Sequence, residues 1–220
     1  ANSRLADYNS SIATWKPSGE QVMQTFKRQA IPMTWDFPES NIMGLKAIAW
    51  HNAVKYAADN LSATSGTLAS IPGTASQKDA QTQSISGNKF ISTDPPYYDN
   101  IEYAALSDFF YVWLRRSLQS VFPGLFATLA VPKAEELVAS STRHGGRENA
   151  ETFFLTGMTE AMRSLATQAH PAGPITIYYA FKQSDTQETN GTSSTGWVTF
   201  LNAMHRAGLQ LSGTWPMRTE

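Results

Sequence analysis

A pair of prolines directly after a short apolar run constrains this chain more than any other feature. Pro95 and Pro96 have a fixed φ and lack a backbone N–H, and they push the preceding residue toward an extended conformation, so no strand or helix can continue through them. Residues 89–93 before them, Lys-Phe-Ile-Ser-Thr, are typical of a short buried strand. The chain must therefore turn at the carboxyl end of a strand, where open α/β sheets bind their ligands.

The residues Asp94, Pro95, Pro96 and Tyr97 form an Asp-Pro-Pro-Tyr motif that suits the binding of a planar amine. The Asp94 carboxylate can accept one N–H of an exocyclic amino group, and the Pro95 carbonyl, held in place by the ring, can accept the second. The Tyr97 ring can stack on a base, an interaction of about 1–3 kcal/mol. Accepting both hydrogens turns the nitrogen lone pair toward an electrophile. The same residues can also form only a rigid turn beside a buried aromatic pair.

Hydrophobic periodicity predicts helices and strands that alternate along much of the chain. Helices are expected at residues 20–29, 44–61, 101–118, 145–170 and 197–205, and strands at residues 89–93, 175–181 and 209–215. The stretch 62–87, rich in Ser, Thr, Ala and Gln, is expected to form loops around a weak strand. Such alternation implies an α/β fold with parallel strands and helices on both faces of the sheet.

The motif and its surroundings resemble the amino-directed DNA methyltransferases that use S-adenosylmethionine, whose signature is Asp/Asn/Ser-Pro-Pro-Tyr/Phe. Residues 93–116 are similar to one branch, the large adenine-specific DNA methylases, some of which carry a zinc ribbon. Further similar segments are Arg-Gln-Ala-Ile-Pro-Met-Thr-Trp-Asp-Phe at 28–37, Arg-His-Gly-Gly at 143–146 and Trp-Pro-Met-Arg-Thr-Glu at 215–220. The resemblance implies a Rossmann-like class I methyltransferase fold.

One element of that family is missing from the sequence. Its members hold the methionine part of the cofactor with a glycine-rich loop after the first strand, and no Asp/Phe-x-Gly-x-Gly segment occurs here. In the family this loop lies upstream. We therefore expect the chain to be the carboxyl-terminal part of the catalytic domain, with a partial sheet, and to need the upstream part of the same protein to bind S-adenosylmethionine.

The resemblance also divides the chain. We expect residues 1–65 to form a helical and irregular segment that packs on the catalytic core, and residues 66–220 to form the partial catalytic domain, with an inserted loop at about 125–147. Asp79 resembles the acidic residue whose side chain reaches the cofactor's adenine amine, although a solvated loop aspartate fits the same pattern.

Further residues are candidates for the substrate site. Tyr98 can close the other side of the base pocket, Tyr103 follows the motif at the start of a helix, and Lys182 ends a predicted strand at the same sheet edge as Asp94. A lysine at a strand end can equally be solvated.

A segment with two glycines and several basic residues lies between two of the predicted helices. We expect its cations, Lys133, Arg143, His144 and Arg147, to contact DNA phosphates without reading sequence. A solvated connection is the alternative.

Composition excludes several classes of protein. There is no cysteine, which rules out the cytosine-C5 methyltransferases, with their Cys nucleophile, and cysteine-based zinc sites. The four histidines have no ligand spacing, so no metal site is expected. No apolar run reaches the roughly 20 residues of a membrane span, and no signal peptide is recognisable, so we expect a cytoplasmic protein. The net charge of −1 argues against this chain as the main DNA-binding part of the protein, because binding to the phosphate backbone depends on an excess of Lys and Arg.

These observations favour the target-base half of a DNA adenine-N6 methyltransferase, with the base flipped out of the duplex. Methylation of cytosine N4 or of an RNA base is an open alternative, because the same acceptors hold either amine. A non-catalytic interaction module of a larger modification or defence complex is a second alternative, suggested by the missing glycine loop.

Overall fold

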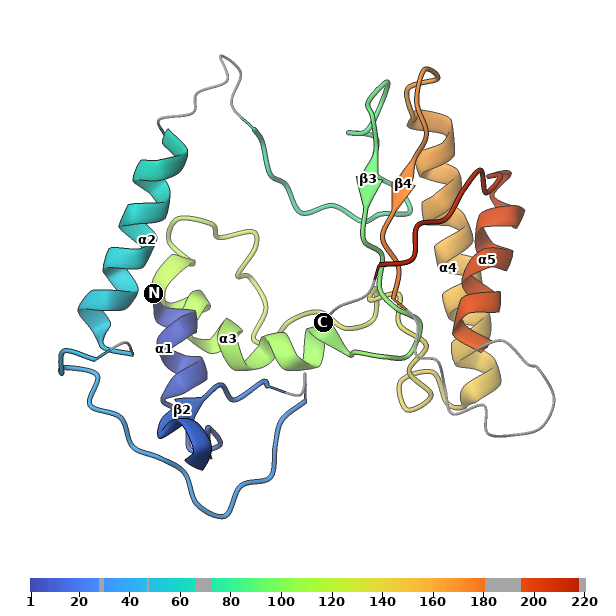
Figure 1. The fold of residues 1–220 in the computed structure, drawn as a ribbon. Coiled ribbons are helices and arrows are strands. Elements are labelled where there is room, and N and C mark those ends of the chain that lie inside the picture. Colours follow the sequence, from blue (N-terminus) through green and yellow to red (C-terminus); the bar gives the residue numbers. More distant parts are fainter. Residues whose placement is uncertain (28–29, 47, 66–72, 181–194, 218–220) are drawn as a thin grey trace. The chain divides into compact units, whose positions relative to one another are not determined.

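The computed structural model describes residues 1–27, 30–46, 48–65, 73–180 and 195–217 (Figure 1). Helices and short strands both occur, so the chain is a mixed α/β protein, as the alternation in the sequence predicts. None of the described helices is long and apolar enough to cross a membrane.

Two compact units make up the chain, and each is assembled from two separate stretches. The first unit contains residues 1–75 and 103–133, and the second contains residues 76–102 and 134–220. The domain boundary expected after residue 65 stays a prediction.

The first unit combines helices with a β-hairpin. Its helices are α1 (Asn2–Tyr8), α2 (Trp50–Ser65) and α3 (Tyr103–Leu118), and its hairpin pairs β1 (Thr14–Lys16) antiparallel with β2 (Gln21–Met23). Helix α1 packs on both α2 and α3. The Phe26 ring lies 5.2 Å from the Phe109 ring and 5.3 Å from the Phe110 ring, which fixes the segment after the hairpin on α3.

The helix expected at residues 20–29 is wrong over its described part, residues 20–27. A 3-10 turn (Pro17–Gly19) and the left-handed conformation of Glu20, with a φ of 45°, reverse the chain and pair Trp15 with Val22. Hairpin pairing to β1 uses the backbone groups that a helix would need, and a three-residue strand is too short to show periodicity.

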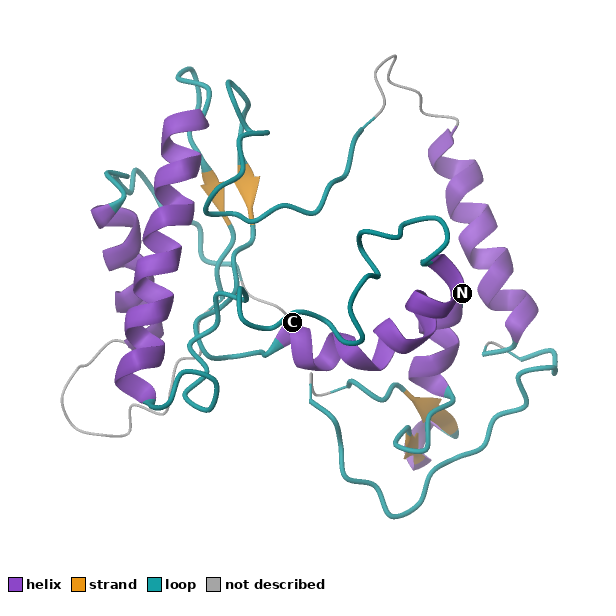
Figure 2. Cartoon of the chain, turned by 180° about the vertical axis from the view of Figure 1, so that it is seen from behind, coloured by secondary structure: helices purple, strands orange, loops and turns teal. Residues whose placement is uncertain are grey.

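The second unit contains a parallel strand pair and two long helices. Strand β3 (Ser92–Thr93) pairs with β4 (Thr176–Ile177), and the helices are α4 (Arg147–Gln168) and α5 (Thr195–Arg206). Figure 2 shows α4 and α5 side by side next to the strands. The pairing extends backward from β3, because the N–H of His170 donates to the Lys89 carbonyl at 2.9 Å.

The core of the second unit lies between α4 and α5. Its most buried large side chains are Phe154, Met158 and Met162 from α4 and Phe200 from α5. Ile177 and Tyr179 pack partly against this core, so alternate residues from β4 onward face the helices.

The sequence predicts the helices and strands of the two units with unequal accuracy. Helices α3, α4 and α5 are confirmed to within a few residues. The helix expected at residues 44–61 begins later, at Trp50, and ends later, at Ser65. The strand expected at residues 209–215 is wrong, since residues 209–217 have no strand pairing, and the strand expected at 175–181 is reduced to Thr176–Ile177 over its described part. A parallel pair this short shows no Rossmann-like methyltransferase sheet.

Candidate functional site

The Asp-Pro-Pro-Tyr motif follows β3 directly and lies at the carboxyl end of the parallel pair. The N–H of Tyr178 donates to the Thr93 carbonyl at 2.9 Å, which carries the register of the two strands up to the motif. Asp94 is exposed, Pro95 is buried, and Pro96 and Tyr97 are half-buried. The buried proline anchors the turn while the aspartate side chain stays in contact with solvent, as a residue that receives a ligand requires.

A hydrogen bond joins the two ends of the motif. The Tyr97 hydroxyl donates to Asp94 Oδ1 at 2.6 Å. A carboxylate has about four lone-pair positions, so Asp94 can accept a further N–H beside this bond. The bond also orients the tyrosine ring relative to the carboxylate, and the motif therefore presents an acceptor and an aromatic face together.

Tyr98 makes a strained turn immediately after the motif. Its φ is 50°, its N–H donates to the Pro96 carbonyl at 3.2 Å, and its side chain is only 9% exposed. The ring meets Phe154 edge-on at 5.2 Å, and Gly196 of α5 lies so close that an added Cβ would come within 3.0 Å of it. Burial, followed by the charges of Glu151 and Asp99, raises the pKa of Tyr98. The ring belongs to the core, and its predicted role in the base pocket stays a prediction.

Tyr179, two residues after the end of β4, is an aromatic neighbour of the motif. Its ring lies 5.5 Å from the Tyr97 ring, edge to face, and stacks on Phe200 at 4.0 Å. Its hydroxyl is buried and has no hydrogen-bond partner among the described residues. Burial, followed by the nearby Asp99, raises the pKa of this phenol well above its ordinary value, so it is neutral and keeps its proton.

Sequence reasoning did not select Tyr179, although the strand-end rule that pointed to Lys182 applies three residues earlier as well. Lys182 itself lies outside the described residues.

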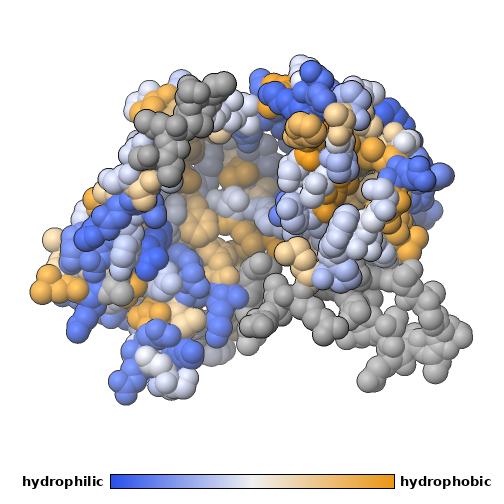
Figure 3. All heavy atoms as spheres, turned by 45° about the horizontal axis from the view of Figure 1, so that its top comes forward, coloured by the Kyte–Doolittle hydropathy of each residue, from blue (hydrophilic) through white to orange (hydrophobic). Residues whose placement is uncertain are grey.

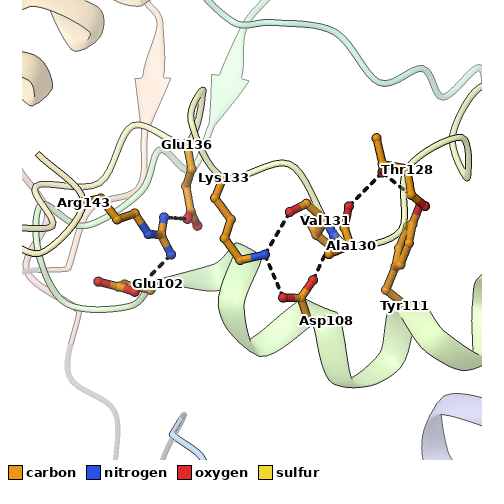
Figure 4. A network of polar contacts seen from close by, with 9 residues as sticks. All are labelled: Glu102, Asp108, Tyr111, Thr128, Ala130, Val131, Lys133, Glu136 and Arg143. Atoms are coloured by element: carbon orange, nitrogen blue, oxygen red, sulfur yellow. Dashed lines mark hydrogen bonds and ion pairs between the residues drawn. The ribbon is translucent and has the colours of Figure 1, made fainter.

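Arg143 is held inside the second unit by two carboxylates. Its guanidinium pairs with Glu136 at 2.5 Å and with Glu102 at 3.0 Å, and its side chain is 18% exposed (Figure 4). Burial works to lower its pKa, but the hydrogen bond to Glu136 and the charge of Glu102 raise it above the ordinary value. The two glutamates carried no signal in the sequence, because Glu102 and Glu136 are far apart along the chain.

The other expected phosphate contacts are distributed over both units. Arg147 is exposed at the first residue of α4, and the preceding His144 stacks on Phe153 at 4.0 Å. Lys133 belongs to the first unit, where it pairs with Asp108 at 2.7 Å. The structure thus keeps His144 and Arg147 together at one helix start and ties Lys133 to α3.

Tyr103 and Asp79 occupy separate places. Tyr103 is the first residue of α3, in the first unit, and 42% of its surface is exposed. Asp79 is exposed in the second unit, and its Oδ1 accepts the N–H of Gln81 at 2.9 Å, which closes a local turn. The described residues contain no group of three or more carboxylate or imidazole side chains placed to hold a metal ion.

Comparison of the chain with profiles of known protein families, with curated protein sequences and with solved structures found no significant match.

Proposed function

We propose that this chain is the target-base half of an S-adenosylmethionine-dependent, cytoplasmic DNA adenine-N6 methyltransferase with a Rossmann-like catalytic domain. The observation that supports it best is the placement of Asp94, exposed at the carboxyl end of a parallel strand and hydrogen-bonded to the Tyr97 hydroxyl. Carboxyl ends of parallel strands are the ligand edge of α/β sheets, and these two side chains supply an acceptor and a stacking face.

The residues of the motif divide the binding of the base among them. A flipped adenine would stack on Tyr97, and its amino group would donate one N–H to Asp94 and the other to the Pro95 carbonyl. Pro96 fixes the turn that aligns these acceptors. Tyr98, Tyr103 and Lys182 remain the proposed contacts to the rest of the substrate. S-adenosylmethionine, when bound, would supply the electrophilic methyl group that the amine accepts.

The described residues do not supply a fitting cradle for that cofactor. Strand β3 is followed by the motif and β4 by two tyrosines, so neither strand of the pair leads into a glycine loop. Gly145 and Gly146 do have a positive φ, but they precede α4 rather than follow a strand. We therefore propose that an upstream part of the same protein carries the glycine loop, and that Asp79 contributes a cofactor contact from this chain.

Exposed apolar side chains are consistent with such a partner. In the first unit Met33, Trp35 and Leu45 are 85%, 94% and 87% exposed. Apolar atoms also reach the surface of the face drawn in Figure 3. Contiguous exposed apolar patches mark surfaces that another polypeptide covers, and we propose that this segment contributes to such a surface.

We expect most of the contacts to DNA to come from other parts of the protein and not from this chain. Lys133, His144 and Arg147 are proposed to add local contacts to phosphates, which position a strand without reading its sequence. Near-neutral charge over the whole chain agrees with a secondary role in holding DNA.

The test is methyl transfer to DNA by the chain joined to its upstream part, measured at saturating cofactor. Asp94→Ala and Tyr97→Ala should each lower kcat/KM at least about a hundredfold, because each removes a group that holds the amine in line. Asp59→Ala, which removes an exposed carboxylate of α2, is the matched control and should leave transfer unchanged. Full transfer by both motif variants would overturn the proposal.

Two further readouts separate the alternatives. Analysis of the methylated nucleoside distinguishes adenine N6 from cytosine N4 and DNA from RNA. Calorimetry with S-adenosylmethionine, on this chain and on the joined protein, identifies a non-catalytic module if neither form binds the cofactor.

A further inference from the structure

A partly buried ion-pair cluster lies next to the Asp-Pro-Pro-Tyr motif in the second unit. Arg143 Nη1 donates to Glu136 Oε2 at 2.5 Å and Nη2 donates to Glu102 Oε2 at 3.0 Å, as Figure 4 shows. The other oxygen of Glu102 accepts the Ser140 hydroxyl at 2.5 Å. The exposed fractions of the Arg143 and Glu136 side chains are 18% and 13%, so this pair is shielded more than an ordinary surface pair, whereas the Glu102 side chain is 41% exposed.

The same loop also holds the backbone of Tyr98. The N–H of Ala139 donates to the Tyr98 carbonyl at 2.9 Å. Leu137, Val138, Ala139 and Ser140 are all at least nine-tenths buried. The loop 136–143 therefore grips the turn 98–102 at both ends, through the backbone at Tyr98 and through side chains at Glu102.

This turn needs external support. A bulky residue in the left-handed region is unfavourable by about 1–2 kcal/mol, and such a conformation persists only where its surroundings determine it. Tyr98, with a φ of 50°, directly follows Tyr97, whose hydroxyl bonds to Asp94. A change in the turn would move the stacking ring relative to the acceptor.

We propose that Arg143 is a positioning residue that clamps the loop 136–143 onto the turn 98–102 and so holds Tyr97 against Asp94. This inference rests on the proposed function for its catalytic consequence, but the clamp itself is a property of the chain alone. It gives Arg143 a different task from the phosphate contact that its sequence suggests.

The charges around Arg143 explain why it does not suit a phosphate. Two carboxylates already share one guanidinium, so the cluster carries a net negative charge. A phosphate that approached Arg143 would be repelled by Glu102 and Glu136, and would have to displace one of them. Arg147 is exposed and makes no ion pair with another residue of the described part of the chain, and it is the better candidate for a DNA contact.

The clamp can be tested on the chain as it is, by amide hydrogen exchange. Arg143→Ala should speed exchange of the amides in residues 97–102 at least about tenfold, while amides of α4 and α5 remain protected. Arg143→Lys should have an intermediate effect, because one ammonium cannot bridge both glutamates in the planar geometry of arginine. Arg163→Ala, which removes an exposed pair with Glu160 on α4, is the matched control and should leave amide exchange in residues 97–102 unchanged. Unchanged exchange in all variants would overturn the clamp.

The positioning role is tested by methyl transfer with the joined protein. Loss of the clamp should lower kcat about tenfold or more at saturating DNA, while the salt dependence of DNA binding stays as in wild type. Arg147→Ala should give the opposite pattern, with weaker DNA binding, a smaller salt slope and a retained kcat. If Arg143→Ala behaves like Arg147→Ala, Arg143 is a DNA contact and the inference is wrong.

The two proposals fail in different ways. A wild-type protein that transfers no methyl group contradicts the proposed function, and hydrogen exchange then decides the clamp by itself. Active wild type with unaltered exchange and kcat in Arg143→Ala contradicts only the clamp.

Discussion

Phe154 is the side chain whose loss should weaken the second unit most. It is 0% exposed at the centre of α4, and its ring meets Tyr98 edge-on at 5.2 Å. Truncation of a fully buried phenylalanine to alanine lowers the free energy of unfolding by about 3–5 kcal/mol, which combines lost transfer free energy with the cavity left behind. About 1 kcal/mol of this should come from the ring pair. Single domains have about 5–15 kcal/mol in total, so the loss is large.

Native-state hydrogen exchange of the α4 amides measures this effect in the unit concerned. We expect the opening free energy of these amides to fall by about 3–5 kcal/mol in Phe154→Ala. Leu129→Ala, at a side chain that is 87% exposed, should change stability by less than about 0.5 kcal/mol. A double-mutant cycle with Tyr98→Leu should give a coupling of about 0.5–1.5 kcal/mol. A fall below about 1 kcal/mol in Phe154→Ala would refute the packing described for α4 and α5.

Two further predictions concern ionisable groups. Burial raises the pKa of Tyr179 in the folded state, so the unfolded state ionises this phenol at lower pH than the folded state does. The contribution of Tyr179 to the free energy of unfolding should therefore be fully present below the ordinary pKa of 10.0 and be lost as pH rises above it. Tyr179→Phe should abolish that loss and, since the hydroxyl has no partner among the described residues, leave stability at pH 7 equal or about 1 kcal/mol higher in urea unfolding; a decrease beyond about 2 kcal/mol would contradict this. Burial works to raise the pKa of Asp108, but hydrogen bonds from Lys133 and the Val131 N–H bring it below its ordinary value of 3.8, so its contribution is present above that pH and is lost as pH falls further. Asp108→Asn should therefore lower the free energy of unfolding by about 0.5 kcal/mol at pH 7 and leave it unchanged at pH 2. An equal loss at both pH values would show that the negative charge of Asp108 does not stabilise the fold.

Periodic apolar residues made the long helices predictable. Phe154, Met158 and Met162 recur at helical spacing in the sequence and form one buried face of α4 in the structure. The turn after β3 was predictable too, because prolines exclude the alternatives locally. The short strands were not predictable. The three residues of β2 are too few to show a hydrophobic periodicity, and the strand forms only through its pairing with β1.

The candidate site was predictable only where it is local. The position of Asp94 at a strand end follows from adjacent residues, whereas the stacking of Tyr179 near Tyr97 depends on the parallel register of β3 with β4. Arg143 shows the same limit. In the sequence, a cation shortly before two glycines suggests a phosphate contact in a mobile loop. Only the fold brings Glu102 and Glu136 next to Arg143.

The ion-pair cluster also has a topological consequence. Glu102 is the last residue of the second unit before the chain leaves for the segment 103–133, and Glu136 follows soon after its return. Because Arg143 pairs with both glutamates, it links the point where the chain leaves the second unit to the point where it returns. Contacts within the second unit compensate for the entropy lost when the ends of the segment 103–133 are brought together. The length of this segment can therefore vary with little effect on the stability of the fold that holds the motif, since loop-closure entropy depends only weakly on loop length.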